Sequence, residues 1–304
     1  MNRIFASRRK TGTPAGESRR GTQEGRMQIS RSLVRSFPIY LALSLGAVIM
    51  IFPFLWMVST AFKPHVFVIE YPPQLIPENP SLDNFLQAWN ANNFQLYFRN
   101  SAFVAVTSTV LSVLFSAMAA YSFARFKFFG KEFIFYTLLL VLMVPSTVVI
   151  IPQFFLMKFL GLRNSLYGLI LIYTSTSLAL SIFLLRGFFE QLPHELEEAV
   201  LIDGGGYLTI FTRIILPLST PALATVAIFS FMGFWDEFIM ALTFIDDPAK
   251  RTLPIAIALF QGQHGTQWGL VFAASLIALV PVVVFFLSLQ RYFIGGLTTG
   301  AFKG

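Results

Sequence analysis

Long runs without a charged residue constrain this chain more than any other feature of its sequence. The first extends from Ser36 to Phe62, and about 20 apolar residues already make a helix long enough to cross the hydrocarbon core of a bilayer. This run is too long for the apolar part of a signal peptide and lacks a small-residue cleavage site, so we expect it to remain as an anchor. With 55% hydrophobic and 12% charged residues, the expected fold class is an all-α membrane protein.

Six membrane spans are predicted, within a membrane domain that covers residues 36–293. They lie at about 37–62, 100–124, 133–157, 164–185, 220–244 and 268–289. Pro145 and Pro152 should kink or break the third span, which neighbouring helices can tolerate by satisfying the freed carbonyls. A short amphipathic helix is predicted within residues 83–94, in the longest connection between spans.

The charged residues predict which side of the membrane each end of the chain occupies. Six spans place both ends on one side, together with the 125–131 loop and the 190–219 loop. That side carries sixteen of the Lys and Arg residues and the other side carries six, so the positive-inside rule puts both termini in the cytoplasm. Residues 1–35, with nine Lys or Arg against two Glu, are predicted to be a disordered tail. An organellar transit peptide is an alternative reading of that tail, and 294–304 form a cytoplasmic carboxyl tail.

The cytoplasmic loop between the fourth and fifth spans is unusually acidic. Its carboxylates fall within fourteen residues, at Glu190, Glu195, Glu197, Glu198 and Asp203. Pro193 suits the start of a helix, and three glycines from Gly204 should end it. Another apolar segment follows from Tyr207; each segment is about ten residues, roughly 15 Å, and too short to cross a bilayer. We therefore predict a helix-turn-helix against the cytoplasmic face. An interfacial helix resting on lipid is the alternative, which an anionic leaflet would disfavour.

This loop resembles a motif of one transporter family. Glu198-Ala199-Val200, Asp203-Gly204-Gly205, Ile214, Leu216-Pro217 and Pro221 are similar to the "EAA…DG…I-LP…P" loop of ABC importer permeases. Val200 and Gly205 stand where that family usually has alanine, and the three glycines suggest a looser turn. In the family, the loop is the coupling helix that enters a groove of the cytoplasmic ATPase.

The resemblance implies a fold, partners and roles for particular residues. The implied fold is the six-span ABC type I importer permease, in a bacterial cytoplasmic (inner) membrane. The implied partners are an ATPase dimer, a second permease subunit that we expect to be a different chain, and an extracytoplasmic solute-binding protein. The residues that would contact the ATPase are Glu195, Glu198, Ala199, Asp203 and Gly204, and Pro217 and Pro221 would form a hinge.

A second resemblance concerns the substrate. The final residues, QRYFIGGLTTGAFKG, and the Trp235-Asp236-Glu237-Phe238 stretch are similar to the carbohydrate-importer branch of these permeases, of the maltose type. We therefore expect a sugar, an oligosaccharide or a related polyol or glycerol phosphate as the solute. Asp236 is a candidate residue of the substrate path, because ionisable groups at membrane depth are costly unless they face a cavity or a partner. Trp235 is the second candidate, because sugars stack on aromatic faces and its indole has a polar N–H next to Asp236. The alternative for Asp236 is a helix end in contact with the outer aqueous phase or an interhelical packing contact. Glu237 points about 100° away on a helix and is expected to be structural.

Several other classes of function receive less support. The chain has no cysteine and its three histidines are scattered, so we expect no metal and no cofactor. It has no GxxxxGK[ST] phosphate loop, which indicates a transport subunit rather than an enzyme, with ATP hydrolysed by another chain. The net charge of +7 reflects membrane topology, so no nucleic-acid partner is expected.

Three alternatives remain at this point. An ion-coupled secondary transporter would use Asp236 or Glu237, although no inverted repeat is evident. A metal-dependent membrane enzyme would use Asp246 and Asp247, although an external turn with paired charges explains these residues better. An ABC permease for a non-sugar solute is the third.

Overall fold

The computed structural model describes residues 17–64, 74–91, 93–262 and 265–301 of the 304-residue chain. The chain divides into two units, Met1–Met57 and Val58–Gly304. Among the described residues, the first unit is the helix α1 (Glu17–Ala61) up to Met57. This helix begins inside the segment predicted as a tail, and its membrane-length apolar part starts at Pro38.

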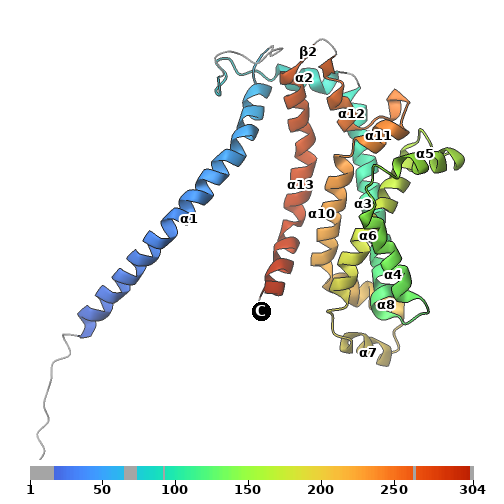
Figure 1. The fold of residues 1–304 in the computed structure, drawn as a ribbon, viewed down its shortest axis with the longest axis horizontal. Coiled ribbons are helices and arrows are strands. Elements are labelled where there is room, and N and C mark those ends of the chain that lie inside the picture. The colour runs from blue at the N-terminus through green and yellow to red at the C-terminus, as the bar shows by residue number, and fades with distance from the viewer. Residues whose placement is uncertain (1–16, 65–73, 92, 263–264, 302–304) are drawn as a thin grey trace, which may run out of the picture. The chain divides into compact units, whose positions relative to one another are not determined.

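The second unit is almost entirely helical (Figure 1). Its elements are α2 (Asp83–Asn90), α3 (Phe94–Arg125), α4 (Lys131–Leu140), η1 (Val141–Met143), α5 (Ile150–Phe159), α6 (Leu166–Phe189), α7 (Glu195–Ile202), α8 (Tyr207–Ile210), η2 (Phe211–Ile215), α9 (Leu216–Leu218), α10 (Thr220–Trp235), α11 (Ile239–Phe244), η3 (Pro248–Lys250), α12 (Leu253–Ala258), β1 (Gln261–Gly262), β2 (Gly265–Thr266) and α13 (Trp268–Ala301). The strands β1 and β2 pair antiparallel.

Four long helices of this unit form a bundle. The helix α3 packs along α6 and α10, and α10 packs along α13. One buried cluster, around Phe94 and Trp235, joins α2, α3, α10, α12 and α13. A second, around Phe189 and Ile210, joins α3, α6, η2 and α10, and a third, around Tyr173, joins α5, α6 and α11. Large apolar side chains stay exposed along α4 and α13, as a lipid or subunit environment allows.

The two ends of the bundle carry different elements (Figure 1). The helices α2 and α12 and the β1–β2 hairpin lie at one end, where the buried amide of Asn84 donates to the carbonyls of Ala61 (2.9 Å) and Lys63 (2.7 Å). The helix α7 lies at the other end, where α13 also ends. The acidic loop and the end of α13 therefore lie at the same end of the bundle, and the side of the membrane that they face remains a prediction.

The helix lengths bear on the prediction of six spans. Among the described residues, four helical segments are long and apolar enough to cross a membrane: Pro38–Ala61, Phe94–Arg125, Leu166–Phe189 and Trp268–Tyr292. A fifth arises if Tyr207–Leu218 and Thr220–Trp235, bent by 76°, count as one span. The predicted third span is divided into α4, η1 and α5. Pro145 lies in the break, as expected, whereas Pro152 lies within the first turn of α5 and does not interrupt it. The count of six remains a prediction.

The predicted fifth span, 220–244, is also interrupted. The helix α10 ends at Trp235, and α11 begins at Ile239. The carboxylate of Glu237 explains this break, because it accepts hydrogen bonds from the backbone N–H groups of Met240 (2.7 Å) and Ala241 (2.9 Å) at the start of α11. Such a side-chain cap satisfies donors that a helix start leaves without partners.

Candidate functional site

The residues predicted to contact an ATPase are all exposed. Glu195, Glu198 and Ala199 lie on α7, where spacings of three and four residues place them on one face. Ile202 continues that face and is 85% exposed. Asp203 caps the helix at its carboxyl end, and Gly204 follows it. An exposed helical face that combines carboxylates with an apolar residue is suited to a protein partner.

The turn after α7 is tightly specified, in contrast to the looser turn expected from three glycines. Gly204 has a φ of +82°, which favours glycine. The backbone N–H of Gly205 donates to the carbonyl of Val200 at 2.8 Å. A Cβ at position 205 would lie 2.5 Å from Cγ1 of Val200 and 3.0 Å from its carbonyl oxygen. The two departures from the family pattern are therefore linked, because the larger residue at 200 requires the smaller one at 205.

This linkage predicts a non-additive pair of mutations. Gly205→Ala should destabilise the folded chain by about 1–3 kcal/mol through overpacking, and adding Val200→Ala should recover most of that loss. Gly206→Ala is the matched control, because nothing lies within 4 Å of the Cβ position at Gly206. Thermal unfolding of the purified variants measures the effect. Equal losses from Gly205→Ala with and without Val200→Ala would contradict the linkage.

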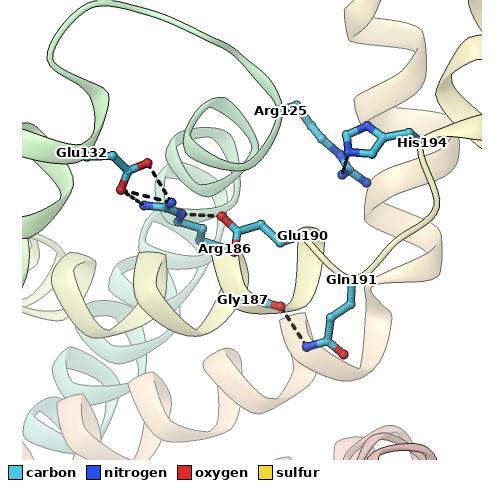
Figure 2. A network of polar contacts seen from close by, with 7 residues as sticks. All are labelled: Arg125, Glu132, Arg186, Gly187, Glu190, Gln191 and His194. Atoms are coloured by element: carbon cyan, nitrogen blue, oxygen red, sulfur yellow. Dashed lines mark hydrogen bonds and ion pairs between the residues drawn. The ribbon is translucent and has the colours of Figure 1, made fainter.

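One carboxylate of α7 faces inward, and the sequence reasoning did not single it out. Glu197 forms an ion pair with Arg125, the last residue of α3; the two side chains are only 11% and 3% exposed. Arg125 also donates to the carbonyl of Leu192 at 2.8 Å and lies 3.2 Å from Nε2 of His194. Figure 2 shows the Arg125 guanidinium directed at His194. The chain that enters α7 is therefore held by the end of α3.

A second arginine lies at the same end of the bundle (Figure 2). Arg186, near the end of α6, contacts Glu190 (2.7 Å) and Glu132 (3.0 Å). Its guanidinium carbon lies 3.9 Å from the ring centroid of Phe135 on α4. This network ties α6 to α4.

The predicted hinge prolines flank the 76° bend between Tyr207–Leu218 and Thr220–Trp235. Pro217 lies in α9, Pro221 is the second residue of α10, and Ser219 lies between these helices at the 76° bend. The residues before Pro217 form a π-helix, Phe211–Ile215. Pro217 has no N–H to donate four residues back, so a widened turn here has a physical cause.

The two candidate substrate-path residues differ in accessibility. Trp235 is 2% exposed, and its indole N–H donates to the carbonyl of Ala278 at 3.0 Å. Asp236 follows the end of α10 and is exposed. Glu237 accepts a hydrogen bond from the Tyr173 hydroxyl (2.8 Å) as well as capping α11. It therefore makes structural contacts, but from the break between α10 and α11 rather than from the continuous helix that was expected.

Two cavities lie near these residues. One of about 370 Å³ is lined by Trp235, Asp236 and residues of α12. Another, of about 310 Å³, lies between α6 and α10, and its lining includes Thr176, Ser181 and Glu237. Neither Trp235 nor Asp236 lines the second cavity. The residues predicted for the substrate path therefore do not include this partly polar cavity.

The aspartate pair of the polar loop makes the charge-paired turn that was expected. Asp247 lies 3.4 Å from Lys250, whereas Asp246 pairs with Arg163 rather than with the neighbouring Arg251. A hydrogen bond from the Ala249 backbone N–H makes the largest contribution to lowering the pKa of Asp247, and the Lys250 ammonium lowers it further. Among the described residues, no group of three His, Cys, Asp or Glu side chains could hold a metal.

Comparison with known proteins identifies the family. Residues 112–298 match the binding-protein-dependent transport system inner membrane component family. The chain belongs to this family. It is 36% identical over 265 residues to the sulfoquinovosyl glycerol transport system permease protein SmoH of Agrobacterium fabrum, covering 87% of this chain and 93% of that protein. It is 38% identical over 263 residues to the trehalose/maltose transport system permease protein MalG of Thermococcus litoralis, covering 86% and 94%.

A solved structure agrees with this family membership. A chain of a bacterial ABC transporter that imports the acidic polysaccharide alginate superposes with a TM-score of 0.76, at 22% identity, over 86% of this chain and 98% of that one. The protein is therefore an ABC permease, an inner-membrane transport subunit rather than an enzyme. Neither the ion-coupled transporter nor the metal-dependent enzyme fits this family.

Proposed function

We propose that this permease moves a carbohydrate across the cytoplasmic membrane, and that an ATPase docked on α7 drives the movement. The observation that carries the proposal is the division of the α7 carboxylates. Glu195 and Glu198 are exposed, while Glu197 is held by Arg125. Free carboxylates on one face leave charge-assisted hydrogen bonds for a partner, and the bound one fixes the helix that presents them.

The carbohydrate part of the proposal rests on the relatives. SmoH and MalG are named for a sulfoquinovosyl glycerol and for trehalose and maltose, and NgcG of Streptomyces coelicolor, 36% identical over 263 residues, for diacetylchitobiose. The carboxyl-terminal residues and the Trp235–Phe238 stretch favour the same branch. An ABC permease for a non-sugar solute is the remaining alternative.

The proposed assembly has three further components. Two ATPase subunits would receive α7 and its counterpart, where Ala199 keeps the contact close and Asp203 and Gly204 extend it. A different permease chain would complete the transport path. An extracytoplasmic solute-binding protein would deliver the sugar, in keeping with the family and with the alginate transporter solved with a pentasaccharide-bound periplasmic protein.

Within the membrane domain, we propose that movement of α7 passes through the bend at Pro217 and Pro221 and reorients α10. Asp236, at the end of α10, is the proposed sugar contact, and the buried indole of Trp235 fixes its position. Asp236→Ala should then raise the KM for sugar about tenfold, the loss expected for one charge-assisted hydrogen bond. Asp83→Ala, on α2, is the control, and an unchanged KM in Asp236→Ala would contradict the contact.

The assembly itself is tested by affinity purification. The tagged chain is extracted from its native membrane in mild detergent, and co-purifying proteins are identified by mass spectrometry. We expect a P-loop ATPase and a second multi-span permease, followed by sugar-stimulated ATP hydrolysis in the reconstituted complex. Recovery of the chain alone, with transport that survives ATP depletion, would contradict the proposed function.

A further inference from the structure

The contacts of Arg125 have an arrangement that a single structural salt bridge does not require. Each guanidinium nitrogen has its own partner: Nε faces Glu197, Nη1 faces His194 and Nη2 donates to the carbonyl of Leu192. All three partners lie within residues 192–197, which run from the connection after α6 into the first turn of α7. One side chain therefore fixes both the position and the direction of the helix start.

The surroundings of this contact make it rigid. The Arg125 side chain is almost completely buried, and removing one member of a buried charge pair leaves the other uncompensated, which is strongly unfavourable. Aromatic contacts also join the end of α3 to α8 and η2, the helical segments that follow the glycine turn. Tyr121, one turn before Arg125, packs on Phe211 with ring centroids 5.3 Å apart, and Phe126 packs edge-on against Tyr207 at 5.1 Å.

The helix that makes these contacts is central to the bundle. The helix α3 packs along both α6 and α10, so a displacement of its end reaches two other long helices through direct packing. The bend at Ser219 offers a different route, which leads from α9 into α10.

We propose that Arg125 is a positioning residue that clamps the ATPase-coupling helix α7 to α3, so that α7 and α3 move together during transport. The proposal rests on the proposed function, because it takes α7 to be the element that the ATPase displaces. The contact between α3 and α7 is a second mechanical connection, in addition to the proline-flanked bend. Within it, Glu197 is the ion-pair partner of Arg125. Glu198, on the exposed face, remains the residue that meets the partner.

The test uses the complete transporter, reconstituted in vesicles with its ATPase, partner permease and binding protein. Transport is measured per ATP hydrolysed, because that ratio reports coupling separately from the amount of folded protein. Arg125→Ala should retain the ATPase on co-purification and lower the ratio about tenfold, within the range of coupling changes that such substitutions cause. A ratio equal to that of the parent transporter would overturn the proposal.

Arg186→Ala provides the matched control. Arg186 lies at the same end of the bundle and makes two ion pairs, but with Glu132 and Glu190 rather than with α7. Arg186→Ala should leave the coupling ratio within about twofold of that of the parent transporter. An equal fall of the ratio in both variants would show general loosening of this end and would also overturn the clamp.

Two further variants address the case in which Arg125→Ala does not accumulate. Arg125→Lys keeps the charge but has one ammonium in place of a three-nitrogen fork, so it should fold and lower the ratio about threefold. The exchange Arg125→Glu with Glu197→Arg should recover transport relative to either single reversal. Full coupling in Arg125→Lys, or no recovery in the exchanged pair, would overturn the proposal. Failure of the parent chain to retain any ATPase would instead contradict the proposed function.

Discussion

Replacing Glu198 with lysine is expected to separate this permease from its ATPase and to lower transport below about 1% of the parent level. The residue is exposed on the face of α7 that it shares with Glu195, Ala199 and Ile202. A reversed charge in a protein interface replaces an attraction by a repulsion, and like-charge contacts cost several kcal/mol. A cost of about 3 kcal/mol already corresponds to roughly a hundredfold weaker docking.

Co-purification of the ATPase and sugar uptake into vesicles are the two measurements for this variant. Glu78→Lys is the control, because Glu78 is also an exposed acid but precedes α2 at the other end of the bundle. The thermal stability of both variants should equal that of the parent, since neither side chain is buried. Intact transport and intact transport-coupled ATP hydrolysis in Glu198→Lys would remove Glu198 from the coupling site.

Among glycine-to-alanine substitutions in the described bundle, Gly168→Ala is expected to give the largest loss of folding stability. A Cβ at this position would lie 2.2 Å from the carbonyl oxygen of Leu162, so backbone would have to move. Overpacking of this kind costs about 1–3 kcal/mol and occasionally more. The strained corner beside it includes Asn164 at φ 56°, whose side chain accepts from the N–H groups of Asp246 and Asp247.

The same helix supplies a control for this prediction. Gly187 is exposed on α6, with nothing within 4 Å of its Cβ position. Gly187→Ala should therefore stabilise the chain by up to about 1 kcal/mol through helix propensity. Thermal unfolding in detergent, followed by size-exclusion chromatography, distinguishes the two variants. Equal unfolding midpoints would show that the close approach at Gly168 relaxes without cost.

The parts of the fold that the sequence predicts are those governed by local chemistry. Uncharged runs predict the long helices, Pro145 predicts the break before α5, and the acidic segment with its glycines predicts α7. Each of these depends on residues that are close in the sequence. The same holds for the exposed face of α7, which follows from helical spacing.

The parts that the sequence does not predict depend on residues brought together from distant segments. Nothing in the spacing distinguishes Glu197 from its acidic neighbours as the partner of Arg125, because that choice depends on how α3 meets α7. Trp235 was a candidate for the substrate path because indole can contact sugars, yet its N–H is used by the carbonyl of Ala278. The need for glycine at 205 becomes visible only with the position of Val200.

The contact between Trp235 and Ala278 also limits how α10 can move. Phe231, one turn earlier on α10, stacks on Phe285 of α13 with ring centroids 4.2 Å apart, so the two helices are joined both by a hydrogen bond and by stacked rings. Sliding α10 by one turn, about 5.4 Å, would break both contacts at once. The smallest unit that can reorient as a rigid body is therefore the pair α10 and α13. When α10 reorients, the surface that α13 presents to its surroundings reorients as well.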